Sequence, residues 1–154
     1  MITGIHHTGI VVRDAAVMQA FYCEAFGMKV IGQIDSEAPP TGNHTGIPNS
    51  KRTLVFLGFP GNKHLVELVY YIDPPAADGH LGKHQFGASH LCFTVDDLQA
   101  DYERLTNLGV RFETEPKFSE TPNGRLGVIY ARDPEGNWLE LIEGRVFPAE
   151  EGVG

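Results

Sequence analysis

Apolar and polar positions along the chain predict two segments of similar build, each a strand, an amphipathic helix and further strands. In the first segment, residues 2–12 are rich in β-branched side chains and predict a strand. A helix follows, with apolar residues at helical spacing: Val17, Met18, Phe21, Tyr22 and Ala25. Asp14 is placed to cap this helix and Gly27 to end it. Further strands are expected at residues 28–34, 52–59 and 64–72.

The second segment repeats this order. Residues 89–95 predict a strand, and Asp96 with Gln99 three residues on resembles a capping box. The helix that follows carries Leu98, Tyr102, Leu105 and Leu108, and Gly109 ends it. Three more strands are expected, at residues 110–113, 126–131 and 137–142.

Landmark residues recur at matching intervals in the two segments, which predicts an internal repeat. His7 precedes Asp14 by seven residues, and His90 precedes Asp97 by seven. Each segment ends in an apolar strand that contains one glutamate, Glu67 or Glu140. We therefore expect an α+β protein of two βαβββ modules that form one functional domain. The modules are expected at residues 1–72 and 88–144, with a linker at 73–87 and an unstructured tail at 145–154.

Two loops rich in proline and glycine interrupt the strands. Residues 35–50 form the longer loop, and a loop of this length in a small protein is more often a lid or binding segment than a simple connection. The second loop is expected at residues 116–124. We predict that segments 35–50 and 116–125 close over a site, with Arg125 or Lys51 offering positive charge to an acidic substrate.

The alternation of strand side chains predicts where the site lies. Glu67 shares a strand face with Val69 and Tyr71, and His7 shares one with Gly9 and Val11. In the second module Glu140 shares a face with Trp138, and His90 with Cys92. A carboxylate on an apolar face needs a cation, a proton or an exit to water. If a pseudo-twofold axis relates the modules, two imidazoles and two carboxylates converge, which is typical of a divalent transition-metal site.

The remaining histidines are weaker candidates. His6 is expected to point away from His7, and His80 and His84 lie among glycines in a predicted loop. His44 and His64 lie in or beside loops, and His44 is placed to reach a substrate from the first lid. A lone histidine in an apolar strand is more often structural, so the case for His7 and His90 rests on the repeat.

Composition excludes several classes of function. The 154 residues carry 12 Lys and Arg against 20 Asp and Glu, a formal charge of −8, and no basic stripe that would bind nucleic acid. The two cysteines show no CxxC spacing, which argues against a disulfide framework or a zinc ribbon. No signal-like segment or long apolar run is present, so we expect a cytoplasmic protein without a membrane partner.

Four segments resemble the vicinal oxygen chelate superfamily, the fold of glyoxalase I, bleomycin-resistance proteins and extradiol dioxygenases. They are HHTGIVVRD at 6–14, VELVYY at 66–71, ASHLCFTVDD at 88–97 and DPEGNWLELIE at 133–143. The resemblance covers residues 2–144. It implies a cupped, mostly antiparallel sheet of paired modules with a metal on its concave face. The ligand positions it implies are His7, Glu67, His90 and Glu140.

The ligand set bears on the reaction that the resemblance implies. Proteins of the family that only sequester drugs lack such a set, extradiol dioxygenases lack a ligand at the place of Glu67, and methylmalonyl-CoA epimerase typically has glutamine there. The pattern therefore favours a lyase or isomerase of the glyoxalase I type, with Glu140 as the base and Glu67 as its symmetric partner. An iron-dependent dioxygenase and a non-enzymatic binding or resistance protein remain the alternatives.

The substrate is expected to differ from that of bacterial glyoxalase I. Where those enzymes hold glutathione with an arginine and an asparagine, this chain has Val11 and Tyr71, which favours a more apolar or aromatic small molecule. The expected pocket is lined by Val11, Val69, Tyr71, Cys92 and Trp138. The cofactor is expected to be one divalent ion, Ni, Co, Mn, Zn or Fe. Pairing of modules in many relatives predicts a homodimer, with each site built within one chain or between two.

Overall fold

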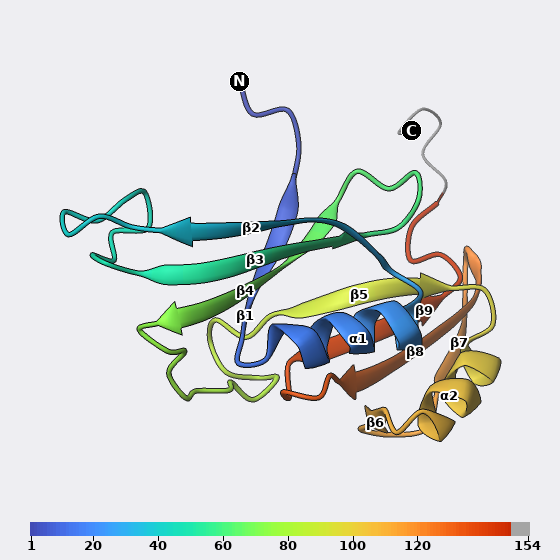
Figure 1. The fold of residues 1–154 in the computed structure, drawn as a ribbon. Helices are drawn as coiled ribbons and strands as arrows, with labels where there is room; N and C mark the ends of the chain where they lie inside the picture. Colours follow the sequence, from blue (N-terminus) through green and yellow to red (C-terminus); the bar gives the residue numbers. More distant parts are fainter. Residues whose placement is uncertain (149–154) are drawn as a thin grey trace. The chain divides into compact units, whose positions relative to one another are not determined.

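The computed structural model describes residues 1–148, and the chain divides into two compact units, Met1–Gly79 and His80–Gly154 (Figure 1). The boundary between the units lies inside the segment 73–87 that the sequence predicts as a linker. Residues 149–154 of the predicted tail lie outside the described residues. No helix between residues 1 and 148 is long and apolar enough to cross a membrane.

The first unit is a four-stranded mixed sheet with one helix. Its elements are β1 (His7–Val12), α1 (Ala15–Phe26), β2 (Lys29–Glu37), β3 (Lys51–Gly58) and β4 (Leu65–Asp73). The strands lie in the order β1-β4-β3-β2, with β1 parallel to β4 and the other neighbours antiparallel. The sequence pattern predicted both ends of α1, since the Asp14 carboxylate accepts from Ala16 N and Val17 N and Gly27 ends the helix at φ 73°.

Two strand boundaries in this unit differ from the sequence prediction by more than one residue. The first strand begins at His7 and not at residue 2, and β2 continues to Glu37, so the predicted loop at 35–50 is shorter. Polar side chains stabilise the extension of β2, because Thr53 Oγ1 donates to Asp35 Oδ1 at 2.7 Å and Lys51 pairs with Glu37 at 3.2 Å. Asp35 and Glu37 are polar and exposed on the outer strand β2, so the hydrophobic pattern carries no signal for them.

The second unit has a five-stranded sheet and one helix. Its elements are β5 (His90–Val95), α2 (Leu98–Asn107), β6 (Arg111–Phe112), β7 (Lys117–Thr121), β8 (Gly124–Arg132) and β9 (Trp138–Glu143). The order is β5-β9-β8-β6, and β7 also pairs with β8. The two units therefore have equivalent strand pairing. Strand β5 is parallel to β9, as β1 is to β4. The short strands β6 and β7 both pair with β8, in the way that β2 pairs with β3.

Two predictions in the second unit are wrong. The expected loop at 116–124 is largely strand β7, which pairs with β8 through a tight turn, so segment 116–125 is a hairpin and not a free lid. The strand was missed because its residues KFSET are mostly polar and exposed. The helix is capped by Asp97 and not by Asp96, since the Asp97 carboxylate accepts from Ala100 N at 2.9 Å.

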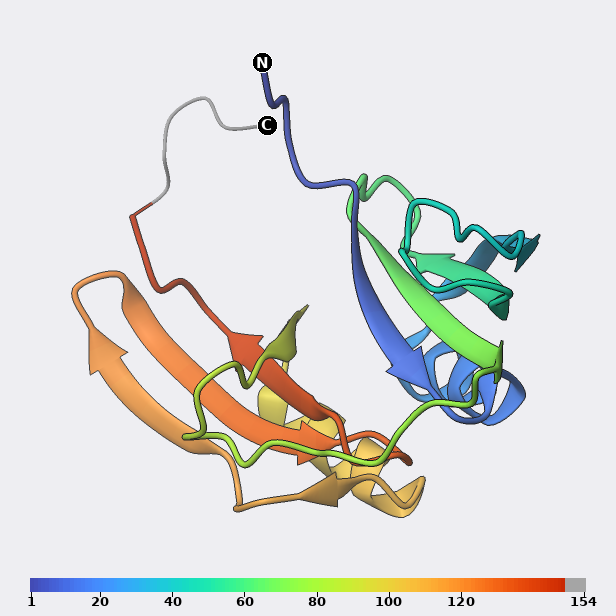
Figure 2. The same cartoon turned by 90° about the vertical axis from the view of Figure 1, so that its left-hand side faces the viewer.

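In each unit the helix covers one face of the sheet and leaves the other face for chemistry (Figures 1 and 2). In the first unit Met18 and Tyr22 of α1 are buried against β3 and β4, and Val66 and Leu68 of β4 are buried with them. In the second unit α2 packs on β9, beside the buried Leu139 and Leu141. Alternation therefore turns Glu67 and Glu140 to the faces without a helix.

Candidate metal centre

Each unit brings one predicted histidine and one predicted glutamate into contact. His7 Nε2 lies 3.3 Å from Glu67 Oε2, and His90 Nε2 lies 2.9 Å from Glu140 Oε2. The register of the parallel strands produces both contacts. His7 lies opposite Leu65, two residues before Glu67, and His90 lies opposite Trp138, two residues before Glu140. The two pairs therefore occupy equivalent places in the two modules.

An aromatic ring lies beside the histidine of each His–Glu pair, at equivalent positions in the two modules. Phe56 lies opposite Glu67 and meets the His7 ring edge-on, with centroids 5.7 Å apart. Tyr130 lies opposite Glu140 and meets the His90 ring in the same way at 5.3 Å. Sequence reasoning missed both rings. The signal was available, because Phe56 precedes Glu67 by eleven residues and Tyr130 precedes Glu140 by ten.

The histidines are open and the carboxylates are sheltered. The His7 and His90 side chains are 37% and 40% exposed, against 13% and 16% for Glu67 and Glu140. His6 was expected to point away, but its Nδ1 lies 2.8 Å from His7 Nδ1. The prediction failed because His6 lies outside β1, so strand alternation does not govern it. One of the two Nδ1 atoms donates and the other accepts, an arrangement that orients the His7 ring with its Nε2 toward Glu67.

The surroundings of the two carboxylates differ. Burial, the Glu140 charge and a hydrogen bond to Glu140 together raise the pKa of the Cys92 thiol to about 12. Burial also raises the pKa of Tyr130, and the nearby Glu140 and Cys92 add to the shift. Both groups therefore stay protonated at neutral pH beside Glu140. At the place of Cys92 the first unit has Gly9, where an added Cβ would lie 3.2 Å from Glu67 Oε2.

The donor sets suit a divalent metal. Two ligands that each lie about 2.1 Å from one ion, at about a right angle, are about 3 Å apart, and both His–Glu separations match this spacing. Imidazole nitrogen and carboxylate oxygen together suit Zn, Ni, Co, Mn or Fe. Each unit supplies two such donors, and nowhere among residues 1–148 do three or more His, Cys, Asp or Glu side chains gather into a metal-binding group.

The structure brings some of the predicted pocket residues to these pairs and excludes one. Val11 lies opposite Val69 on β4, and both share with Tyr71 the face that carries Glu67. Cys92 lies opposite Glu140, with Trp138 one step along the same face. Five of the six predicted pocket residues thus lie on the faces that carry the His–Glu pairs.

Arg125 lies on the other face of its sheet. Its guanidinium lies over the Phe118 ring at 3.9 Å and within 3.7 Å of Glu143, whose second oxygen accepts from Leu98 N at the start of α2. Alternation along β8 groups Arg125 with Gly127 and the buried Ile129 on the side covered by α2. Its position gives no support to the predicted contact with a substrate beside Glu140.

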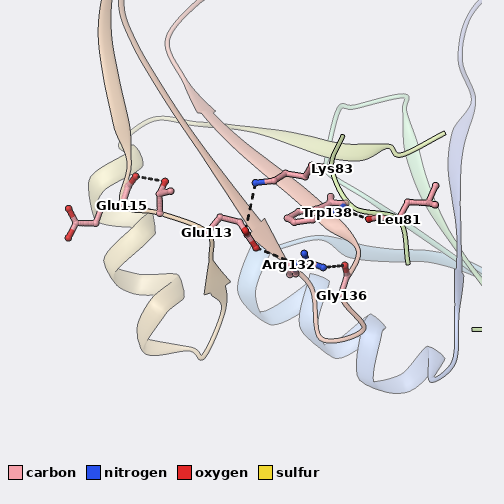
Figure 3. A network of polar contacts seen from close by, with 8 residues as sticks. Leu81, Lys83, Glu113, Glu115, Arg132, Gly136 and Trp138 are labelled. Atoms are coloured by element: carbon pink, nitrogen blue, oxygen red, sulfur yellow. Dashed lines mark hydrogen bonds and ion pairs between the residues drawn. The ribbon is translucent and has the colours of Figure 1, made fainter. Parts of the chain in front are cut away.

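A segment that the sequence treats as a plain linker covers part of the second site (Figures 2 and 3). The buried Trp138 ring lies between the Arg132 guanidinium at 3.5 Å and Lys83 Nζ at 4.7 Å, and Trp138 Nε1 donates to the Leu81 carbonyl at 2.8 Å. Glu113 lies within 3.8 Å of Lys83 and 3.2 Å of Arg132. Lys83 also lies 5.0 Å from the Tyr130 ring centre, so it stands on the face of the His90–Glu140 pair.

Fold and site together define an α+β protein of two βαβββ-like modules, each with one His–Glu pair on its open face. The chain belongs to the Glyoxalase/Bleomycin resistance protein/Dioxygenase superfamily, whose family model matches residues 4–141.

Relatives of several kinds are similar to this chain. The uncharacterized protein YwbC of Bacillus subtilis is 31% identical, over 90% of this chain and 96% of its own length. Glyoxalase I of Saccharomyces cerevisiae is 30% identical over 94% of this chain, which spans 47% of that protein. The lactoylglutathione lyase of Pseudomonas aeruginosa is 27% identical, over 90% of this chain and 81% of its own.

Solved structures show the same fold. A glyoxalase family protein from Bacillus cereus matches with a TM-score of 0.81 at 22% identity, over 94% of this chain and 95% of its own. Glyoxalase I from Zea mays matches with a TM-score of 0.65 at 27% identity, and the chain spans about half of it, 46%.

Proposed function

We propose that this chain is a metal-dependent lyase or isomerase of the glyoxalase I type, in which His7, Glu67, His90 and Glu140 hold one divalent ion. The observation that carries the proposal is the shared register of the two His–Glu pairs. A sheltered carboxylate within 3.3 Å of an open imidazole is a typical pair of metal ligands, and its appearance twice at equivalent positions supports a common use.

The proposed ligand set combines both units. Each unit supplies a nitrogen and an oxygen donor, and four donors leave one or two positions of a divalent ion for substrate. The two modules that share an ion belong either to one chain or to two copies of the chain in a homodimer.

Glu140 is the proposed base. When bound, the ion acts as a Lewis acid that stabilises negative charge on the oxygen atoms of the substrate. Glu140 takes the proton from the carbon beside the substrate carbonyl, and the thiol of Cys92 donates a hydrogen bond to this carboxylate. Tyr130 and Trp138 shelter the carboxylate from water. Return of this proton from Glu140 to the neighbouring carbon completes an isomerisation, and Glu67, its symmetric partner, would serve as the other carboxylate ligand.

The proposed substrate is an adduct of an α-oxoaldehyde with a small thiol. The relatives named lactoylglutathione lyase support this class of chemistry. Val11 and Tyr71, on the face of the first His–Glu pair, favour a thiol that is more apolar or aromatic than glutathione.

Replacement of Glu140 by glutamine tests the base. We expect Glu140→Gln to lower kcat on hemithioacetals of methylglyoxal by about a thousandfold or more, because the amide cannot accept the proton. Metal content should fall only partly, since three ligands remain. Turnover is followed with glutathione, benzyl mercaptan and coenzyme A as thiols, and bound metal by mass spectrometry.

Glu143→Gln is the matched control, because Glu143 lies on β9 but contacts Arg125 and the start of α2. Full turnover in Glu140→Gln would remove Glu140 from the mechanism. Oxygen consumption on catechols that depends on ferrous iron, without turnover of hemithioacetals, would replace the proposal with a dioxygenase.

A further inference from the structure

One arginine in the first unit is buried without a carboxylate. Arg52 on β3 is 8% exposed, and none of the ion pairs between residues 1 and 148 includes it. Its Nη2 lies 3.1 Å from His44 Nε2, and its guanidinium lies 5.9 Å from the centre of the Tyr71 ring. A guanidinium can only donate, so His44 Nε2 accepts. A buried cation held by neutral groups is costly unless an anion joins it.

Two hydrogen-bonding atoms at this place have no partner. Within the described part of the chain, the buried side-chain atoms without a hydrogen bond are Ser50 Oγ and Arg52 Nε. Ala38 N donates to the Ser50 carbonyl at 2.8 Å, which continues the pairing of β2 with β3 one step beyond Lys51. Ser50 and Arg52 are therefore two residues apart in an extended segment, with their side chains on one side. Buried polar atoms in native proteins normally have partners, and the Ser50 hydroxyl and the Arg52 Nε–H are two donors that an anionic group would satisfy.

The segment that carries His44 is held by its own hydrogen bonds. Asn43 Oδ1 accepts from Thr45 N at 3.0 Å and from Thr45 Oγ1 at 2.7 Å, and Thr45 Oγ1 accepts from Ile47 N at 3.3 Å. Asn49 N donates to the Pro39 carbonyl at 3.2 Å. These bonds hold the loop on both sides of His44, the residue that meets Arg52 Nη2 from this loop.

The donors share a sheet face with the first His–Glu pair. Arg52 lies opposite Tyr71, and four residues along β3 Phe56 lies opposite Glu67. Four residues of strand span about 13 Å. The unpartnered donors and the His7–Glu67 pair thus stand at two ends of one face, separated by about the length of an extended small molecule.

We propose that Ser50 and Arg52 form a carboxylate-binding site that holds the acidic end of an extended substrate. Arg52 Nε–H and the second hydrogen of Nη2 provide two parallel donors that match a carboxylate, and the Ser50 hydroxyl provides a third. The site itself rests on the first unit alone, and its role in substrate binding rests on the proposed function. It selects compounds that carry a carboxylate about 10 to 13 Å from the reacting carbonyl.

The test observes the unpartnered atom directly. The full chain is labelled with ¹⁵N-arginine and titrated with succinate, with inorganic phosphate, and with sodium chloride at matched ionic strength. We expect succinate to shift one arginine Nε–Hε signal in a saturable way, and Arg52→Lys to remove that signal. Ser50→Ala should weaken succinate binding at least threefold. Arg125→Lys is the matched control, because Arg125 already has Glu143 and the Phe118 ring as partners.

The succinate titration either supports or overturns the proposed carboxylate site at Ser50 and Arg52. A succinate shift that does not saturate, that chloride reproduces, or that Ser50→Ala leaves unchanged would overturn it. Ser50→Ala keeps the test valid if Arg52→Lys unfolds, which circular dichroism checks. Saturable succinate binding in a chain without turnover supports the site and contradicts the proposed function. Turnover of hemithioacetals without an anion response contradicts the site alone.

Discussion

The two glutamates of the proposed centre have different close neighbours. Glu140 has a thiol and a phenol beside it, from Cys92 and Tyr130, whereas Glu67 has Gly9 and Phe56 at the matching positions. The donors around Glu140 suit a carboxylate that exchanges a proton, and the apolar surroundings of Glu67 suit a fixed ligand. The sequence repeat identified the two glutamates. It did not reveal that their neighbours differ, because cross-strand register determines which residues lie beside each glutamate.

Gly9 lies against the carboxylate of Glu67, so a side chain added there tests whether Glu67 is a metal ligand. An alanine Cβ there would lie 3.2 Å from Glu67 Oε2 and would displace the carboxylate by a few tenths of an ångström. We expect Gly9→Ala to weaken metal binding about tenfold, with little change in the free energy of unfolding because Gly9 does not have a positive φ. Isothermal titration with Zn²⁺ and urea unfolding measure the two effects.

Gly4→Ala serves as the control, since nothing lies within 4 Å of a Cβ at that position. Unchanged Zn²⁺ affinity in Gly9→Ala would mean that Glu67 is not a ligand.

At the scale of elements, the sequence predicted the strongly apolar or well-capped segments and missed the polar ones. Helix α1 and strands β3, β4 and β9 follow from hydrophobic periodicity, and Asp14 and Gly27 mark both ends of α1. Strand β7 and the end of β2 were missed, because their pairing rests on backbone hydrogen bonds and polar side chains. The contact of segment 80–87 with Trp138 was also missed, since residues distant in sequence make it.

Segment 80–87 is expected to shield the second His–Glu pair. Trp138 is the only tryptophan of the chain and is 7% exposed, so its emission reports whether this segment stays in place. We expect Lys83→Ala to shift the emission to the red and to raise quenching by acrylamide about twofold, because Lys83 covers the Trp138 and Tyr130 rings.

Lys117→Ala is the matched control, since Lys117 is an exposed residue of β7. Emission and quenching that are identical in the wild type and Lys83→Ala would contradict a shielding role for this segment.

At the scale of the whole molecule, the repeat is the feature that the sequence reveals best. Matching histidines and glutamates identified the modules, and the family model covers both of them. What the sequence could not predict is the direct contact of His with Glu inside each module, because that contact depends on the register of the parallel strands. The proposed centre combines both pairs and therefore depends on how modules assemble.

Metal stoichiometry tests most directly whether both modules bind the same ion. Chelator-treated wild type, His7→Ala, His90→Ala and the control His84→Ala, an exposed loop histidine, are equilibrated with Zn²⁺ or Ni²⁺, and bound metal is counted per chain. We predict one ion per chain in the wild type and the control, and an affinity lower by about a hundredfold or more in each of the other variants. Two ions per chain, with His7→Ala removing one and leaving the other unchanged, would contradict a shared centre.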